Sequence, residues 1–569
     1  MRVDQKAEGP RQSMSWLHTW ASLILGWLLY AIFVTGTLSF FQNEISTWMK
    51  PETHQSIHAQ SQVQQMQVAL NYLQKNHPDA GSWNIQLPNS RQTTTEVTIR
   101  AVGEDPKARR GGTRITLDSA TGEVIEPRDT RGGGFLYRFH FELYGLPRLW
   151  TRWLVGIATM FMLVAIVSGI IAHKKIFKDF FTFRSGKGQR SWLDAHNATA
   201  VFALPFHLMI TFSGLLLLMF MFMPWGINQA YENRQQFLRD QQASMIEQPQ
   251  KAEDVPREGE RAARGERGQQ RGEHTEGRGE EHPKPELRPA PLTDLAPIMA
   301  AVQQQWKDNP IASINIISPN TDQAKIELRA LRAESVAHRN VYATLNYNGV
   351  TGQDETDKNI RIKNPSIPSA IYNVVTVLHE ARGLDLALRW LLFCSGILGT
   401  LMVATGLILW CLKRAPQQQK QGYKSFGFRL VEVLNITAII GLPLACAAYF
   451  YANRFIPADV EMRLNWEIRS FFTVWLLTLI YAIFRTHRQA WLDLLLLATL
   501  AFVLLPVVNL MTGGQALWNS IAQGQWMIAS VDLAMWVMAV IFYFAYDKVK
   551  KHQGLPNKKV KVAVQEAEA

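Results

Sequence analysis

Six histidines lie within or beside long apolar stretches of this 569-residue sequence. They are His18, His140, His173, His196, His207 and His379. Because an ionisable side chain within an apolar stretch is costly, these positions favour a function for the imidazoles. His196 and His207 are 11 residues apart, so on one α-helix they would share a face and lie about 16 Å apart along its axis. Two imidazoles at two depths on one face suit two stacked cofactors.

Cysteine usage excludes cofactor sites built from thiols. The three cysteines, Cys394, Cys411 and Cys446, are too few for a four-thiolate iron–sulfur site, a four-cysteine zinc ribbon or a disulfide scaffold. The absence of a C-x-x-C-H motif excludes covalent c-type haem. Neutral imidazole is a preferred axial ligand of haem iron, and a helical core without thiols or an acidic cluster suits iron held in a porphyrin better than a bare ion. Histidine is therefore the predicted carrier of redox chemistry.

The elements that must position these histidines are apolar helices. The chain is 47% hydrophobic and 19% charged, yet its mean hydropathy is −0.07, so apolar and polar residues must be segregated. Four stretches without acidic or basic residues can each cross a hydrocarbon core of about 30 Å: 16–41, 153–172, 198–225 and 390–412. Four more are expected at 430–451, 471–484 extended back through Trp466, 490–511 and 526–546. The sequence thus predicts eight membrane spans.

Charge predicts the orientation of these spans. Lysine and arginine exceed aspartate and glutamate by 12 (59 against 47). The basic residues concentrate in 174–195, 413–429, 485–488 and 548–569, so by the positive-inside rule these segments and both termini are cytoplasmic. Segments 42–150 and 226–388 are then expected on the opposite face, which for a bacterial inner membrane is the periplasm. The basic balance reflects topology in a lipid bilayer, and no nucleic-acid partner is expected.

The two external segments have similar patterns. The first predicts a helix at 62–76, strands at 95–100 and 113–118, and a turn at 121–123. The second predicts a helix at 295–307, strands at 324–329 and 341–346, and a turn at 348–349. Each is expected to form a small α+β unit. Residues 246–290, rich in Arg, Glu, Gly and Pro, predict a disordered linker, and the histidines of the external segments, His54 among them, receive no role.

The membrane segments repeat as well. Ser15-Trp16-Leu17 before His18 aligns with Ser191-Trp192-Leu193 before His196, and each histidine is followed 18 residues later by a glycine, Gly36 and Gly214. In the second and fourth spans, Gly169 and Gly406 each follow an Arg-Trp pair, with its arginine 17 residues earlier. The chain therefore contains span, external unit, span, twice over. This repeat predicts a pseudo-twofold four-helix bundle in which equivalent side chains face each other.

Several motifs resemble one known family. The run 169–184 around His173, the run 190–197 ending in His196-Asn197, and 204–207 ending in His207 resemble the PepSY-associated transmembrane proteins, an iron-regulated inner-membrane group that includes ferric-siderophore reductases. Leu378-His379 and 405–410 fit the last core span of that family. The external units correspond to its PepSY domains, with Thr121-Gly122-Glu123 as the clearest trace. The resemblance covers residues 10 to about 415.

The resemblance implies two haem b groups in the bundle and electron transfer to a periplasmic ferric siderophore. His140 would pair with His379 at the outer haem because they are repeat equivalents. At the inner haem, His196 or His207 would pair with His173, with His18 as an alternate. No nucleotide-binding G-x-G-x-x-G unit is present. The electrons are therefore expected from quinol or a separate donor protein.

The expected fold is an α-helical integral membrane protein with a four-helix haem bundle, about four extra helices and two PepSY-like periplasmic domains. Its order is N-terminus and first span (1–41), periplasmic unit (42–150), span (151–173), cytoplasmic loop (174–195), span (196–225), second periplasmic region (226–388), span (389–412), cytoplasmic loop (413–429), four spans (430–547) and tail (548–569). The extra spans receive no role.

Two other functions are compatible with the sequence. The PepSY-like units could be the active part of a membrane-anchored protein that binds or inhibits peptidases, with structural histidines. Alternatively, the chain could transport a siderophore or ferrous iron, with the extra spans forming the path. Only the reductase, an oxidoreductase, requires bound haem.

Overall fold

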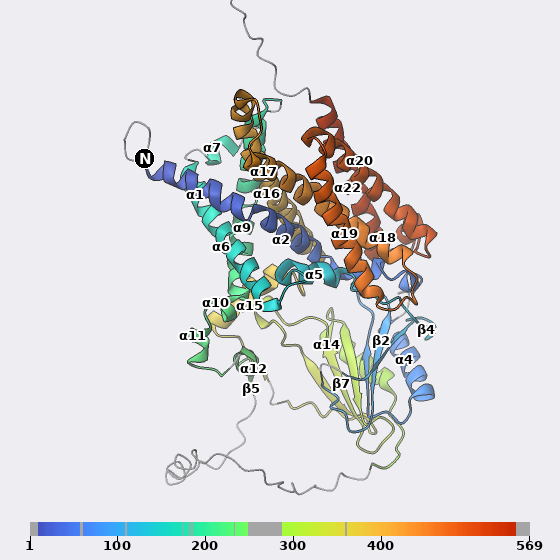
Figure 1. Cartoon of the computed structure of the whole chain (residues 1–569). Helices are drawn as coiled ribbons and strands as arrows, with labels where there is room; N and C mark the ends of the chain where they lie inside the picture. Colours follow the sequence, from blue (N-terminus) through green and yellow to red (C-terminus); the bar gives the residue numbers. More distant parts are fainter. Residues whose placement is uncertain are drawn as a thin grey trace, which may run out of the picture. The chain divides into compact units, whose positions relative to one another are not determined.

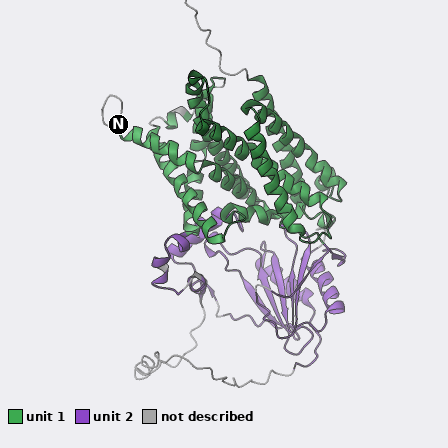
Figure 2. Cartoon of the chain, in the orientation of Figure 1, with its two compact units in different colours: residues 1–55, 127–218, 386–569 green, residues 56–126, 219–385 purple. Residues whose placement is uncertain are grey.

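The computed structural model describes residues 9–552 apart from 57–60, 109–110, 174–175, 181–183, 185, 233, 248–286 and 359–360. The chain divides into two compact units, which Figure 2 distinguishes by colour. Unit 1 comprises residues 1–55, 127–218 and 386–569, and unit 2 comprises 56–126 and 219–385. Each unit therefore combines segments that are far apart in the sequence.

Unit 1 consists of helices. Its first part contains α1 (Pro10–Ile24), α2 (Gly26–Ser39), α3 (Gln42–Trp48), the 3-10 turn η1 (Pro51–Thr53), α5 (Gly133–Glu142), α6 (Arg148–Ala172), α7 (Ile176–Phe180), α8 (Gln189–Phe202) and α9 (Leu204–Leu217). Its C-terminal part contains α16 (Leu386–Gln421), α17 (Phe426–Ile436), the π-helical turn η3 (Thr437–Gly441), α18 (Leu442–Phe455), α19 (Arg463–Phe484), α20 (His487–Met511), α21 (Leu517–Ala522) and α22 (Trp526–Lys551) (Figure 1).

The helices of unit 1 establish a multi-pass membrane protein. Within the described residues, six are long and apolar enough to cross a membrane: α6, α16, α17 through α18, α19, α20 and α22. Two bent pairs, α1 with α2 and α8 with α9, raise the number to eight if each pair is one span. These eight segments overlap the eight predicted stretches, including the backward extension through Trp466 in α19. The predicted span 198–225 is an exception at its end, because α9 stops at Leu217 and residues 219–228 form the short helices α10 (Met219–Phe222) and α11 (Pro224–Asn228).

The two bent spans confirm the internal repeat. The axis turns by 64° between α1 and α2 and by 66° between α8 and α9. The break falls at Leu25 and at Ala203, each seven residues after the repeat histidine, His18 or His196. Pro205 lies in the first turn of α9, where its missing N–H is harmless, but it prevents α8 from continuing unbroken. Packing follows the same repeat, because α1 packs on α6 and α8 packs on α16.

The helices beyond α16 share an apolar core with the N-terminal part of unit 1. This core contains Tyr449 and Phe471, both fully buried, together with Trp48 of α3 and Phe135 of α5. The span from α17 to α18 is the most enclosed of the candidate spans. It therefore forms the centre of the C-terminal helices.

Unit 2 contains a seven-stranded antiparallel sheet. Its order is β4 (Val124–Ile125), β3 (Thr113–Leu117), β2 (Thr95–Arg100), β1 (Ser82–Gln86), β6 (Ile311–Ile317), β7 (Lys325–Ala330) and β8 (Thr344–Asn348). Strands β1 and β6 pair in a register that places Ile85 opposite Ile314. The helices α4 (Gln62–Asn76) and α14 (Leu295–Trp306) contribute Met66 and Met299 to its buried core. The two external segments, expected as separate α+β units, thus contribute to one sheet and one core.

The remaining elements of unit 2 are short, except for one helix. They are α10 (Met219–Phe222), α11 (Pro224–Asn228), α12 (Arg234–Ala243), β5 (Ile246–Glu247), the 3-10 turn η2 (Val336–His338), β9 (Arg361–Ile362) and α15 (Ile367–Glu380). The helix α15 carries His379, and β5 pairs with β9.

Most predicted elements of unit 2 are confirmed. Helix 62–76 and strand 95–100 have the predicted bounds, and a capping box at Ser61 and Gln64 starts the helix. Strand β8 begins at Thr344 instead of 341, because Val341 closes a turn onto His338 and Asn340 is left-handed, with φ 65°. The predicted linker falls largely outside the described residues, although Ile246 and Glu247 at its start form β5.

Candidate cofactor site

Three of the predicted histidines make the same contact with a neighbouring helix. In each case the imidazole Nδ1 lies within hydrogen-bond distance of a backbone carbonyl that precedes a glycine by four residues. The contacts are His18 to Ala165 O (2.8 Å) before Gly169, His140 to Ile32 O (2.8 Å) before Gly36, and His196 to Met402 O (2.9 Å) before Gly406. Gly36, Gly169 and Gly406 therefore lie where the imidazole of a histidine contacts the neighbouring helix.

Glycine is required at these positions because the rings approach the helix backbone closely. A Cβ atom added to Gly36 would lie 2.6 Å from Cε1 of His140. At Gly169 and Gly406 the corresponding distances to the rings of His18 and His196 would be 3.1 and 3.2 Å. Even alanine would therefore push against the imidazole, most severely at Gly36.

The carbonyl contacts determine the tautomer of each ring. A carbonyl oxygen can only accept a hydrogen bond, so Nδ1 of His18, His140 and His196 must carry the proton. Nε2 then carries the lone pair of the neutral ring. Histidines that bind a metal usually have this arrangement, because the hydrogen bond orients the ring and makes the ligating nitrogen more basic. Burial also lowers the pKa of His140 on α5, which favours the neutral form.

His18 and His196 form a pair. Their ring centres are 6.3 Å apart and the ring planes are inclined by 63°. Two axial imidazoles on one metal ion have ring centres about 6.4 Å apart, from two bonds of about 2 Å and two nitrogen-to-centre distances of roughly 1.2 Å. The described residues contain no group of three His, Cys, Asp or Glu side chains that could hold a bare metal ion. The pair therefore fits haem iron, which takes only two ligands from the protein.

His207 occupies the most buried position of the six histidines. It lies on α9, is 0% exposed, and neither ring nitrogen has a hydrogen-bond partner among the described residues. Its ring centre lies 6.3 Å from that of Phe33 in an edge-to-face contact. A Cβ atom added to Gly399 would lie 3.3 Å from its Nε2. Buried polar nitrogens without partners are costly, so this imidazole also fits a bound group inside the helices.

The other two histidines lie in different surroundings. His173 ends α6 and lines a polar cavity of about 400 Å³, together with Arg184, Arg190 and Asn197. The sequence favours His173 as the partner of His196, whereas the geometry favours His18. His379 belongs to unit 2 and His140 to unit 1, so their pairing stays a prediction.

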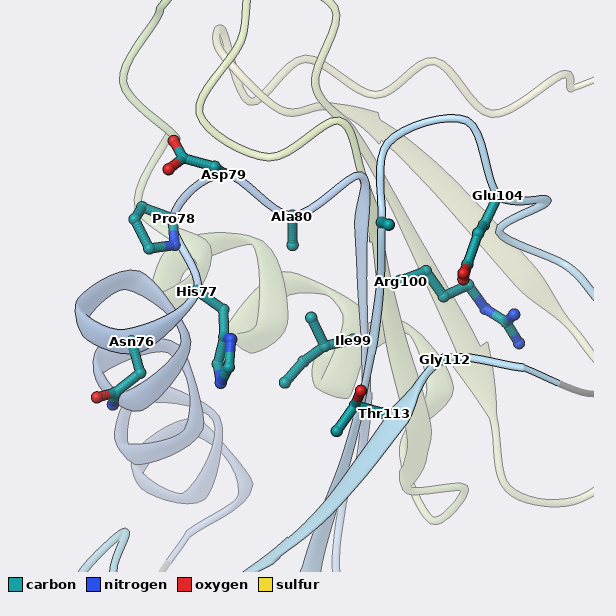
Figure 3. A pocket seen from close by; sticks show the side chains of 11 residues that line it. Asn76, His77, Pro78, Asp79, Ala80, Ile99, Arg100, Glu104, Gly112 and Thr113 are labelled. Atoms are coloured by element: carbon teal, nitrogen blue, oxygen red, sulfur yellow. The ribbon is translucent and has the colours of Figure 1, made fainter.

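Unit 2 has a cavity that the sequence did not indicate. Its volume is about 520 Å³, and Figure 3 shows His77 and Arg100 among the side chains that line it. Arg100 donates to Ala108 O at 2.6 Å, which holds the guanidinium beside the strand. No spacing signal identified this cavity, because α4 and the sheet contribute its walls from different parts of the chain.

One comparison with known proteins identifies a family for this chain. No curated protein matches the sequence significantly. The PepSY-associated TM region family matches residues 15–413, which is more than half of the chain and ends before α17. The repeat glycines and all six candidate histidines lie within that match. The chain therefore belongs to the family of the PepSY-associated TM region.

Proposed function

We propose that this protein is a haem b oxidoreductase that carries electrons across a bacterial inner membrane to a ferric siderophore in the periplasm. The single observation that carries the proposal is the His18 and His196 pair, whose ring centres are 6.3 Å apart and which would together hold one haem. Both termini would be cytoplasmic, as the distribution of basic residues predicts.

The histidines would act as ligands at two depths. His18 and His196 would hold the inner haem, with Nδ1 of each ring anchored on a carbonyl. His140 would hold the outer haem, with His379 as its proposed partner. The carbonyl of Ile32 accepts the hydrogen bond from His140, and Ile32 lies 14 residues after His18. At most about 21 Å of helix therefore separates His18 from the carbonyl that orients His140. His207 would complete or line one of the two haem sites.

The bound haem would supply reversible one-electron chemistry between ferric and ferrous iron. The protein would orient the ligands through the carbonyl contacts, provide close approach at the glycines and exclude water with apolar helices. Each electron that reaches the outer face would reduce one chelated Fe(III) to Fe(II). Ferrous iron binds hard oxygen ligands more weakly than ferric iron, so reduction would release the metal from the siderophore. Quinol or a separate protein would supply the electrons.

An absorbance spectrum of the purified full chain tests this function. We expect a Soret band that shifts on reduction with dithionite. Addition of a ferric siderophore should reoxidise the haem and reverse this shift. A colourless protein would contradict the proposal and favour the peptidase-binding or transport alternatives. If haem is present but a ferric chelate does not reoxidise it, the cofactor is right and the substrate is wrong.

A further inference from the structure

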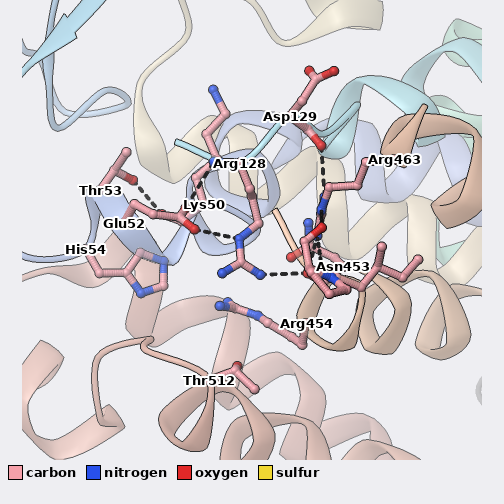
Figure 4. A network of polar contacts seen from close by, with 12 residues as sticks. Lys50, Glu52, Thr53, His54, Arg128, Asp129, Asn453, Arg454, Arg463 and Thr512 are labelled. Carbon is pink, nitrogen blue, oxygen red and sulfur yellow. Dashed lines mark hydrogen bonds and ion pairs between the residues drawn. The ribbon is translucent and has the colours of Figure 1, made fainter. Parts of the chain in front are cut away.

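The segment 128–132 leads into α5, the helix that carries His140. Four hydrogen bonds tie this segment to α18 and α19. They are Arg128 Nη1 to Asn453 O (2.7 Å), Arg463 Nη1 to Asp129 O (2.8 Å), Thr130 Oγ1 to Glu467 Oε2 (2.7 Å) and Tyr449 OH to Gly132 O (3.0 Å). Figure 4 shows Arg128 reaching Asn453 and Arg463 reaching Asp129. Two helices outside the family match therefore hold the start of α5.

The groups that make these bonds on α18 and α19 are buried. Arg463 is 2% exposed, and Tyr449, Asn453 and Glu467 are 0% exposed. Arg463 and Glu467 form an ion pair one turn apart on α19, and Asn453 donates to the same carboxylate at 2.8 Å. The two charges are paired with each other, and Arg463 and Glu467 also bond to Asp129 O and Thr130, so a shift of the segment 128–132 would leave buried polar groups with fewer partners.

Aromatic packing holds the body of α5 against the same helices. Phe135 has its ring centre 5.0 Å from that of Tyr449 and 5.2 Å from that of Phe471. Phe139, next to His140 in the sequence, lies 5.7 Å from Phe471. Ring pairs at these separations attract beyond their area burial. The side of α5 defined by Phe135 and Phe139 is thus fixed by α18 and α19.

The His140 side of α5 meets the family core. His140 Nδ1 donates to Ile32 O of α2, and Gly133 N donates to Ser46 Oγ of α3 at 3.0 Å. The helix has only ten residues, which is too short to be stable without tertiary contacts. Its position, and with it the direction of the His140 imidazole, is therefore set between α2 on one side and α18 and α19 on the other.

We infer that α18 and α19 position His140, through the hydrogen bonds to 128–132 and the aromatic contacts of α5. This assigns a role to part of the C-terminal helices, which lie beyond the family match. Tyr449 and Thr130 are positioning residues, because they act on His140 through the backbone. The consequence for haem rests on the proposed function, in which His140 is an iron ligand.

The test compares matched tyrosine variants of the full chain. Tyr449→Phe removes the hydrogen bond to Gly132 O, whereas Tyr451→Phe on the same helix removes a bond to Ala501 O at 2.7 Å that does not involve α5. Loss of one hydrogen bond should make amide hydrogen exchange in α5 roughly fivefold faster in Tyr449→Phe. Tyr451→Phe should leave α5 exchange unchanged. Equal α5 exchange in the wild type, Tyr449→Phe and Tyr451→Phe would overturn the inference.

A second pair of variants keeps the inference falsifiable if Tyr449→Phe unfolds. Thr130→Val removes the hydrogen bond that Thr130 Oγ1 donates to Glu467 and the one that it accepts from Gly132 N at 3.1 Å, whereas Thr130→Ser retains a hydroxyl for both. We expect amide exchange in α5 to be faster in Thr130→Val and to return to the wild-type rate in Thr130→Ser. The midpoint potential of one haem should shift only in Thr130→Val. If valine and serine behave alike in α5 exchange, the inference is wrong. A colourless wild type would contradict the proposed function alone, because exchange in α5 still decides the positioning role.

Discussion

His18 and His196, at equivalent positions of the internal repeat, lie in an edge-type contact with ring centres 6.3 Å apart and ring planes inclined by 63°. They come from α1 and α8, and each donates its Nδ1 proton to a carbonyl of the helix on which its own packs, α6 or α16. The pseudo-twofold repeat thus produces one symmetric pair of imidazoles. Neither helix alone could create it, since each contributes a single imidazole.

Replacing either member of this pair should remove one haem. In His18→Ala or His196→Ala, the remaining imidazole cannot hold the iron from both sides, so we expect the haem-to-protein ratio to fall from about two toward one. The ratio is measured by the pyridine haemochrome spectrum. His552→Ala, which changes an exposed residue after α22, is the control. Full haem content in both variants of the pair would exclude them as ligands.

Substitution of alanine for the glycines that contact the histidines should lower the stability of the protein. In Gly36→Ala the new Cβ atom would lie 2.6 Å from the ring of His140, and in Gly169→Ala it would lie 3.1 Å from His18. We expect Gly36→Ala to cost about 1–3 kcal/mol of stability and Gly169→Ala less. Thermal unfolding and the reduced haem spectrum measure both effects.

Gly427 provides the matched control for these substitutions. It lies in α17, and a Cβ atom there would meet nothing within 4 Å. Gly427→Ala should therefore leave the spectrum unchanged. Identical behaviour of all three glycine variants would mean that the close approach of the rings is not required.

The buried ion pair of α19 should contribute far more than an exposed pair. Glu467→Leu leaves Arg463, 2% exposed, without its carboxylate, and we expect a loss of about 3–5 kcal/mol. Asp547→Asn removes an ion pair of similar spacing with the exposed Lys551 and should change stability little. Denaturation of the two variants in the same detergent measures the difference. A small effect of Glu467→Leu would show that the carbonyl contacts of Arg463 are sufficient.

His54 should make stability depend on pH. Burial and the neighbouring Arg454 lower the pKa of His54 to about 3, whereas an unfolded histidine titrates near 6.5. Below that value the unfolded state binds the extra proton, so stability that is present at pH 7 is lost as the pH falls from about 6.5 toward 3. The neutral ring is held between Thr47 O and Gln515 N.

His54→Gln tests this dependence. The variant should be less stable than the wild type at pH 7, and the difference should shrink at pH 5, because glutamine does not titrate. Unfolding midpoints at the two pH values measure the effect. A difference that is constant with pH would mean that His54 does not titrate between the folded and unfolded states.

Much of the helical architecture was predictable from local sequence. Runs without charge identify spans whatever their neighbours are, because each apolar helix satisfies its own backbone hydrogen bonds in lipid. The spacing of histidines and glycines revealed the repeat. Helix 62–76 and strand 95–100 were predicted to the residue, since capping residues and alternating apolar residues act over short distances.

Other features depend on contacts between distant parts of the chain. The sequence favours His173 as the partner of His196 or His207, with His18 as an alternate, whereas the ring that lies beside His196 in the structure is that of His18. Span boundaries give the depth of a histidine, whereas its direction depends on how the helix is rotated and bent, here by 66° after Ala203. Similarly, the pairing of β1 with β6 joins strands more than 200 residues apart.

The sequence by itself determined the eight candidate spans, the internal repeat and the set of candidate histidines, because these follow from residue type and spacing. Only the tertiary structure decided which carbonyl orients each imidazole, which two rings lie beside each other and why α18 and α19 matter to His140. Those relationships arise from helix rotation and packing between segments up to 337 residues apart, such as Thr130 and Glu467. No local pattern encodes that packing.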